Sequence, residues 1–138
     1  YSAKAIKMTK VLSGRFQISG WDEKPSIEHD DGAKQSHAKM TQRYSGDVQG
    51  SGDIQYLMCY QSAGSALFVG FETVTGSIHG QSGSFVMQHT GQVVIGVASS
   101  NFVIVANSGK GQFAGISGQG NCRSGENAQT HDQLTVTV

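Results

Sequence analysis

The chain has 138 residues, 37% of them hydrophobic, and its ten Lys and Arg residues balance ten Asp and Glu residues. This length suits one domain, and we expect a single domain over residues 1–138. A balanced charge without a basic cluster argues against a nucleic-acid partner. No apolar run approaches the ~20 residues of a membrane-spanning helix, so we expect no membrane partner.

Apolar and polar residues alternate along most of the chain, and Gly, Ser and Asn clusters separate the alternating stretches. This period is typical of half-buried β-strands. It predicts eight strands, at roughly 11–21, 36–49, 53–61, 66–79, 82–93, 95–107, 111–119 and 130–138. Short turns between them favour an all-β fold, a closed eight-stranded antiparallel (up-and-down) barrel. Closure would also remove exposed sheet edges.

Residues 21–34 break the alternation. This stretch holds the sole proline and five of the ten acidic residues. It is too polar and irregular for a core strand, so we expect a long surface loop, lying over one mouth of the barrel.

Charge is distributed unevenly along the chain. Eight of the ten Lys and Arg residues lie within the first 43 positions, and Glu72 is the single formal charge between Ile54 and Gly109. Strands exposed to water normally carry charges on their wet face. We therefore expect the outer face of these strands to be covered, by another element or by another subunit in a homodimer or other homo-oligomer.

Glu72 and His89 are the clearest candidates for a pair of functional residues. A two-residue turn at Gly80-Gln81 would pair His79 with Ser82 and place Glu72 directly opposite His89. Their face is otherwise apolar, and a carboxylate and an imidazole in such a place can exchange a proton near neutral pH. We therefore take them as the candidate catalytic pair. A bulge would instead set Glu72 against Gln88, and a purely structural hydrogen bond is the alternative role.

Aromatic and sulfur-containing side chains accompany this pair. Tyrosines facing a barrel interior can donate to a ligand oxygen while their rings pack, although ordinary core packing remains the alternative. The candidate ligand-binding residues are Tyr44, Tyr56, Tyr60, Phe68, Phe85 and Met87.

The remaining motifs predict neither a metal site nor a cofactor. The histidines show no H-x-x-x-H or H-x-H spacing, and the glycine-rich stretches match no nucleotide-binding fingerprint. Cys59 and Cys122 are too few for a disulfide scaffold, so we expect reduced, partly buried thiols, with a bridge as the alternative. Reduced thiols favour a cytoplasmic location.

Several segments resemble a bacterial family of short proteins that carry a domain of unknown function. The resemblance covers roughly residues 12–138 and rests on Trp21-Asp-Glu, Tyr44-Ser-Gly-Asp47, Tyr56-Leu-Met58, Phe68-Val-Gly-Phe-Glu-Thr-Val-Thr-Gly76 and Gly83-Ser-Phe-Val-Met-Gln-His89. It implies an allene oxide cyclase-like barrel of eight strands. The plant relatives of that fold are cofactor-free oligomers that steer reactive small molecules, and a barrel-lining glutamate in the cyclases suggests such a part for Glu72.

Two functions are therefore open. In the first, the chain is a cofactor-free barrel that binds, and isomerises or cyclises, a small apolar or aromatic molecule. In the second, it is a non-catalytic binding or structural oligomeric barrel, in which Glu72 and His89 merely order the interior. A lumen filled by its own side chains would weaken the first hypothesis.

Overall fold

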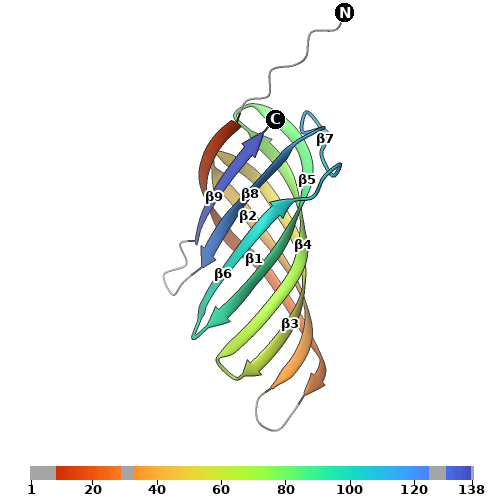
Figure 1. Cartoon of the computed structure of the whole chain (residues 1–138), viewed down its shortest axis with the longest axis vertical. Coiled ribbons are helices and arrows are strands. Elements are labelled where there is room, and N and C mark those ends of the chain that lie inside the picture. The colour runs from red at the N-terminus through yellow and green to blue at the C-terminus, as the bar shows by residue number, and fades with distance from the viewer. Residues whose placement is uncertain (1–8, 29–32, 125–129, 138) are drawn as a thin grey trace, which may run out of the picture.

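The computed structural model describes residues 9–28, 33–124 and 130–137. These residues form one antiparallel sheet, drawn in Figure 1. Its strands are β1 (Thr9–Glu28), β2 (Lys34–Gly46), β3 (Val48–Ser62), β4 (Ser65–Ile78), β5 (Gln81–Val94), β6 (Val97–Ile104), β7 (Lys110–Gly111), β8 (Ser117–Ser124) and β9 (Thr130–Thr137). The all-β class and the antiparallel pairing are those predicted from the alternation. No helix among the described residues is long and apolar enough to cross a membrane.

The strands follow the order β4-β3-β2-β1-β9-β8-β6-β5-β7, and β4 also pairs with β5. The prediction of a closed eight-stranded up-and-down barrel is nevertheless wrong. Strand β9 pairs with β1 as far as Phe16, and the second half of β1 pairs with β2 alone among the described residues. At the other end, β6 stops at Ile104, and the start of β5 pairs on that side with the two-residue β7. The sheet is curled, with nine strands of unequal length, and not a regular closed cylinder.

The expected surface loop at residues 21–34 is also corrected. Strand β1 continues to Glu28 and pairs with β2 from Lys34 onward. Register shifts between Ile18 and Gly20 and between Pro25 and Ile27 accommodate the irregular sequence. Proline and polar residues are tolerated in a strand at a bulge or along an edge, and this half of β1 offers both. Residues 29–32 lie outside the described residues.

The strand expected at 111–119 is wrong as well. Residues Lys110–Gly111 form β7, a turn follows, and the next strand, β8, begins at Ser117. The turn segment contributes buried Phe113 and Ile116 to the interior. Phe113 packs edge-on against Phe85, with ring centroids 5.6 Å apart. This segment therefore fills space where the start of β5 has no full-length strand beside it.

Side chains alternate between the inner and outer faces along β2, β3 and β4. The inward residues form two apolar clusters, a larger one that includes Val74, Phe85 and Phe102, and a smaller one that includes Tyr56 and Phe68. Five other buried residues are polar. Ser36 donates to Glu23, and the remaining four come from different strands: Gln42, Glu72, His89 and Ser100. We call these four residues the polar layer.

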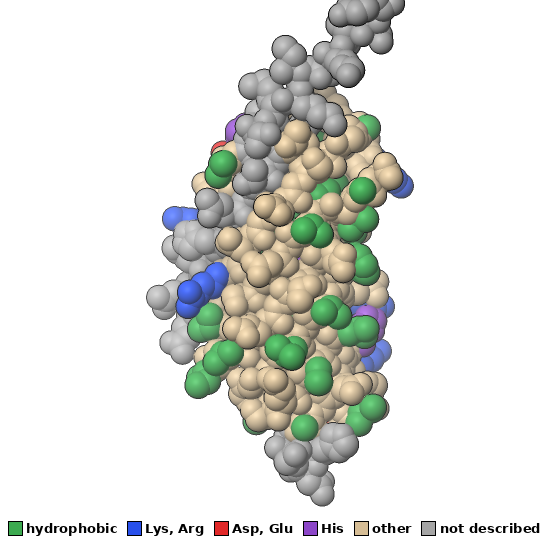
Figure 2. Space-filling model, viewed as in Figure 1, with side chains coloured by type: hydrophobic (Ala, Val, Ile, Leu, Met, Phe, Trp, Pro, Cys, Tyr) green, Lys and Arg blue, Asp and Glu red, His purple; other side chains and the backbone are tan. Residues whose placement is uncertain are grey.

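Outward-facing side chains are mostly uncharged on the face shown in Figure 2, where Lys and Arg lie near its margins. This agrees with the single formal charge between Ile54 and Gly109.

Candidate functional site

The β4–β5 hairpin sets the positions of Glu72 and His89. Its two-residue turn is His79–Gly80, with φ angles of 47° and 82°, and Ile78 pairs with Gln81. Two successive positive φ angles are the requirement of a type I′ turn. The predicted turn at Gly80-Gln81 is therefore wrong, and Glu72 lies opposite Met87 instead of His89.

The pair forms nevertheless. The error in register is two residues, which leaves each side chain on the same face of the sheet. His89 Nε2 lies 2.7 Å from Glu72 Oε1, and the two side chains are 1% and 0% exposed. Diagonal neighbours on one face remain within reach of long side chains. The structure thus has the expected buried hydrogen bond between the carboxylate and the imidazole.

Two more groups hold the second oxygen of Glu72. Gln42 Nε2 donates to Oε2 at 2.8 Å, and the Tyr44 hydroxyl donates to the same atom. Gln42 Nε2 also donates to the Tyr44 oxygen at 2.6 Å. An ionised carboxylate only accepts hydrogen bonds, and here it meets amide, phenol and imidazole groups that can all donate. The arrangement is therefore complementary to ionised Glu72.

His89 connects this carboxylate to a hydroxyl and a thiol. Ser100 Oγ lies 3.1 Å from Nδ1, and Cys122 Sγ lies 2.7 Å from Ser100 Oγ and 4.0 Å from Nδ1. If Nε2 carries the proton donated to Glu72, Nδ1 presents a lone pair to Ser100. In this tautomer the imidazole is oriented as a base toward Ser100.

Space for the carboxylate depends on a glycine. Gly52 lies opposite Gln42 on β3, and a Cβ atom at Gly52 would stand 2.0 Å from Glu72 Oε2. No side chain fits at that distance. The absence of one at position 52 lets Gln42 and Glu72 meet.

An interior pocket of about 80 Å³ lies beside the polar layer. Its lining is largely apolar, and it includes His89, Gln42, Ser100 and Cys122. The residues of the interior pocket are Phe16, Ile18, Trp21, Met40, Gln42, Tyr56, Met58, Phe68, His89, Val93, Ala98, Ser99, Ser100, Cys122, Arg123 and Ser124. The pocket reaches the surface at three lining residues whose side chains are exposed, Ile18, Trp21 and Arg123.

The six candidate ligand-binding residues do not gather around one cavity. Tyr56 and Phe68 line the interior pocket, with ring centroids 4.7 Å apart. Tyr44 binds Glu72 instead, and Phe85 and Met87 are buried in the larger apolar cluster. The interior is therefore mostly filled by its own side chains.

Tyr60 lies apart from the other candidates, next to Glu23. Burial, followed by the hydrogen bond and negative charge of Glu23, raises the pKa of Tyr60 to about 12. Burial alone would raise the pKa of Glu23, but hydrogen bonds from Ser36, Tyr60 and Trp21 and the charge of Lys34 lower it below its usual value. Lys34 Nζ stands 4.5 Å from the centre of the Tyr60 ring. This cluster joins β1, β2 and β3.

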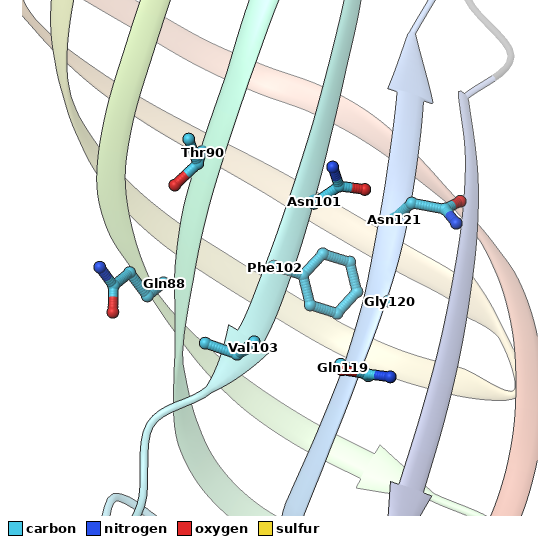
Figure 3. A pocket seen from close by; sticks show the side chains of 8 residues that line it. All are labelled: Gln88, Thr90, Asn101, Phe102, Val103, Gln119, Gly120 and Asn121. Carbon is cyan, nitrogen blue, oxygen red and sulfur yellow. The ribbon is translucent and has the colours of Figure 1, made fainter.

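A larger hollow, about 660 Å³, lies on the outer face of β5, β6 and β8 (Figure 3). Four of its eight residues carry side-chain amides: Gln88, Asn101, Gln119 and Asn121. Gln88 neighbours His89 in sequence and so points to the opposite face of the sheet. The smaller interior pocket is the better candidate site, because the carboxylate–imidazole pair lies beside that pocket.

Three residues of the site, Gln42, Ser100 and Cys122, were not predicted from the sequence as site residues. Gln42 shares the parity of Tyr44, so the predicted strand at 36–49 contained the signal for it. Ser100 and Cys122 lie opposite each other because β6 pairs with β8, and no turn residues in the sequence predicted that pairing. No disulfide joins the two cysteines, as expected, but Cys59 is exposed and not partly buried. Within the described part of the chain, no group of three or more metal-ligating side chains comes together.

Fold and site define a class, a small all-β protein whose curled antiparallel sheet buries a hydrogen-bonded carboxylate–imidazole pair. The chain belongs to the family described as "protein of unknown function (DUF3224)", whose model matches residues 12–135. This confirms the resemblance to a bacterial family of unknown function. A crystal structure of a protein with unknown function from that family, from Shewanella oneidensis MR-1, is similar to this chain. The TM-score is 0.72, with 24% identity over 94% of this chain and 97% of that one. That likeness concerns the fold alone. No curated protein matches the sequence.

Proposed function

We propose that the chain binds a small apolar or aromatic molecule in the interior pocket and moves a proton on it through His89 and Glu72, without a cofactor. The observation that carries this proposal is the position of His89. Its ring lines the pocket, is buried, and is held by Glu72 at 2.7 Å. An oriented base beside an apolar cavity is what general acid–base catalysis requires.

The size of the pocket limits the ligand. About 80 Å³ corresponds to the liquid volume of roughly two to three water molecules, whereas drug-sized ligands occupy about 300–1,000 Å³. The pocket therefore suits a molecule of a few heavy atoms, or one end of a longer molecule that enters past Trp21. Isomerisation or cyclisation fits such a site, because each can proceed by removing and returning a proton within one molecule. A reducing compartment such as the cytoplasm suits two thiols that are not joined by a disulfide.

A thermal-shift screen of small aromatic and short oxygenated aliphatic compounds tests the binding step. A ligand at a hundred times its Kd should stabilise the protein by about 2.7 kcal/mol. Filling the pocket with Ala98→Phe should remove that shift. Absence of any stabilising compound, or a shift that survives Ala98→Phe, would contradict the proposal.

Glu72→Gln tests the chemistry on any compound that binds. Turnover should fall by about two orders of magnitude or more, the usual contribution of positioned proton transfer, while binding persists. Asp53→Asn makes the same acid-to-amide change on the outer face of β3 and is the matched control. Unchanged turnover in Glu72→Gln would leave the pair with a structural role only.

The alternative proposal is a binding-only or structural oligomer. The observations that favour it are the mostly filled interior and the exposed apolar residues on the outer face, among them Leu57 and Phe71. Binding without turnover would support a binding protein, and self-association without any binding would support a structural one.

A further inference from the structure

Cys122 stands at the end of a chain of contacts that begins at Glu72. The pairing of β6 with β8 places Cys122 directly opposite Ser100, and Sγ lies 2.7 Å from Ser100 Oγ. Ser100 Oγ is in turn 3.1 Å from His89 Nδ1, and His89 Nε2 is 2.7 Å from Glu72. Proton transfer to a bound apolar molecule needs only the contact between His89 and Glu72. The Cys122 thiol has no role in that reaction.

The direction of these hydrogen bonds follows from a neutral His89 ring that carries its proton on Nε2. With Nε2–H donated to the Glu72 carboxylate, Nδ1 accepts from the Ser100 hydroxyl, and Ser100 Oγ can accept from the Cys122 thiol. A thiol proton can therefore pass through Ser100 to His89, while Glu72 stabilises the imidazolium that forms. A nucleophile, a base and a group that orients the base make up an activated nucleophile.

Gln42 supplies an independent sign of a ligand. This side chain is 3% exposed, and no group in the described part of the chain donates to its Oε1 atom. Gln42 and Cys122 both line the interior pocket, which holds about 80 Å³. A buried acceptor without a donor is costly, so the site is complementary to a small molecule that brings an O–H group.

We propose that Cys122 is a nucleophilic thiol that reduces small hydroperoxides, including hydrogen peroxide, in the interior pocket. A hydroperoxide combines an O–H donor for Gln42 with an electrophilic oxygen for Cys122, and hydrogen peroxide has only two heavy atoms. The thiol proton moves by way of Ser100 to His89 Nδ1, and the sulfur attacks one peroxide oxygen. An S–O bond forms, the O–O bond breaks, and the leaving oxygen takes the proton from Nδ1 as water or an alcohol. Cys122 loses two electrons and becomes a sulfenic acid, and the peroxide gains two.

Cys59 is an internal control. It is the more exposed of the two cysteines, on the outer face of β3, whereas Cys122 is partly buried. If exposure alone set the rate, Cys59 would be oxidised first. We expect limiting hydrogen peroxide, added to the full chain with a sulfenic-acid trap, to label Cys122 at least about ten times faster than Cys59, because thiolate character governs oxidation. Peptide mass spectrometry measures both sites in one sample.

Two variants test the relay. Ser100→Ala should lower the Cys122 rate about tenfold, the kinetic equivalent of one hydrogen bond, and leave the Cys59 rate unchanged. Ser117→Ala makes the same change at an exposed position of β8, outside the interior pocket, and should leave both rates unchanged. Glu72→Gln should also slow Cys122, since an amide turned toward His89 Nε2 shifts the ring proton to Nδ1. A melting curve of each variant verifies that it is folded.

Equal or faster labelling of Cys59 would overturn the proposal. So would a Cys122 rate that neither Ser100→Ala nor Glu72→Gln changes. These rates are measured without an apolar ligand, so their failure is distinguishable from a failure of the proposed binding function.

Discussion

Glu72 is a buried carboxylate whose hydrogen bonds come from three side chains. His89 binds one of its oxygens, and Gln42 and Tyr44 bind the other. Each partner is itself buried, so none can turn to water if the carboxylate is removed. The contribution of Glu72 to the free energy of unfolding is therefore mainly the cost of leaving these partners without an acceptor.

Glu72→Ala should consequently lower the free energy of unfolding by about 3 kcal/mol, because buried donor groups lose their acceptor. Glu72→Gln should cost much less, about 1 kcal/mol, because an amide oxygen can still accept from Gln42 and Tyr44 while its NH₂ donates to His89. Urea denaturation of both variants measures the difference. Asp53→Ala, which removes an exposed acid, should change stability by less than about 0.5 kcal/mol. Equal losses in Glu72→Gln and Glu72→Ala would show that the pair needs a charge and not merely a hydrogen bond.

At the scale of the strands, Glu23 links the second half of β1 to the first half of β2. Its carboxylate accepts hydrogen bonds from Ser36 on β2 and from the indole of Trp21 on its own strand. With Tyr60 and Lys34, these contacts lower the pKa of Glu23 despite its partial burial. This part of β1, predicted to be a loop, is thus held by its backbone pairing with β2, and Glu23 adds side-chain contacts to that pairing.

The lowered pKa of Glu23 predicts a pH dependence. A carboxyl group whose folded-state pKa lies below its ordinary value of 4.5 stabilises the fold above that pH, and the contribution disappears as the pH falls through the folded-state pKa. Wild-type protein should therefore lose stability below about pH 4.5 more steeply than Glu23→Gln. Melting temperatures between neutral pH and pH 3 measure the slopes. Glu28→Gln, at an exposed position on the same strand, should behave like the wild type, and parallel curves for all three proteins would contradict the prediction.

The strand pattern predicts faces better than partners. A period of two fixes the face of each side chain, which is why Glu72 and His89 share one although the turn was misplaced by one residue. Partners depend on long-range pairing, which explains why the Ser100–Cys122 contact was missed. Residues 21–28 were interpreted as a loop from their polar composition, yet an edge half-strand tolerates that composition. The prediction of a closed barrel was wrong because the alternation of apolar and polar residues does not say how many residues of β1 pair with β9.

At the scale of the whole molecule, the unequal strands create the site. The interior pocket includes Ile18 and Trp21 of β1, which follow the last residue that pairs with β9, Phe16. The polar layer lies beside this opening, with buried aromatic side chains packed against His89, such as Phe102 at 5.3 Å between ring centroids. Among the described residues, the second half of β1 pairs with β2 alone, and the buried base lies close to the surface there without a large cavity.

The outer face of β3 and β4 carries a contiguous group of exposed apolar residues, the outer apolar patch: Leu57, Leu67, Val69 and Phe71. Leu57 pairs with Val69 across the two strands, and Leu57 and Phe71 are 64% and 56% exposed. Apart from buried Glu72, the chain from Ile54 to Gly109 has no formal charge to solvate this face. Contiguous exposed apolar surface marks interaction sites, and a self-complementary patch of this kind suits a two-fold symmetric dimer.

We therefore propose that a second copy of the chain covers the outer apolar patch. Sedimentation velocity at micromolar concentration should show a dimer, and Phe71→Lys should shift it to a monomer, because a lysine in the contact would have to be desolvated. Val103→Lys introduces the same charge on the outer face of β6 and should leave the dimer intact. A monomeric wild type at this concentration would refute self-association. A dimer that Val103→Lys dissociates and Phe71→Lys does not would place the contact on β6 instead of the outer apolar patch.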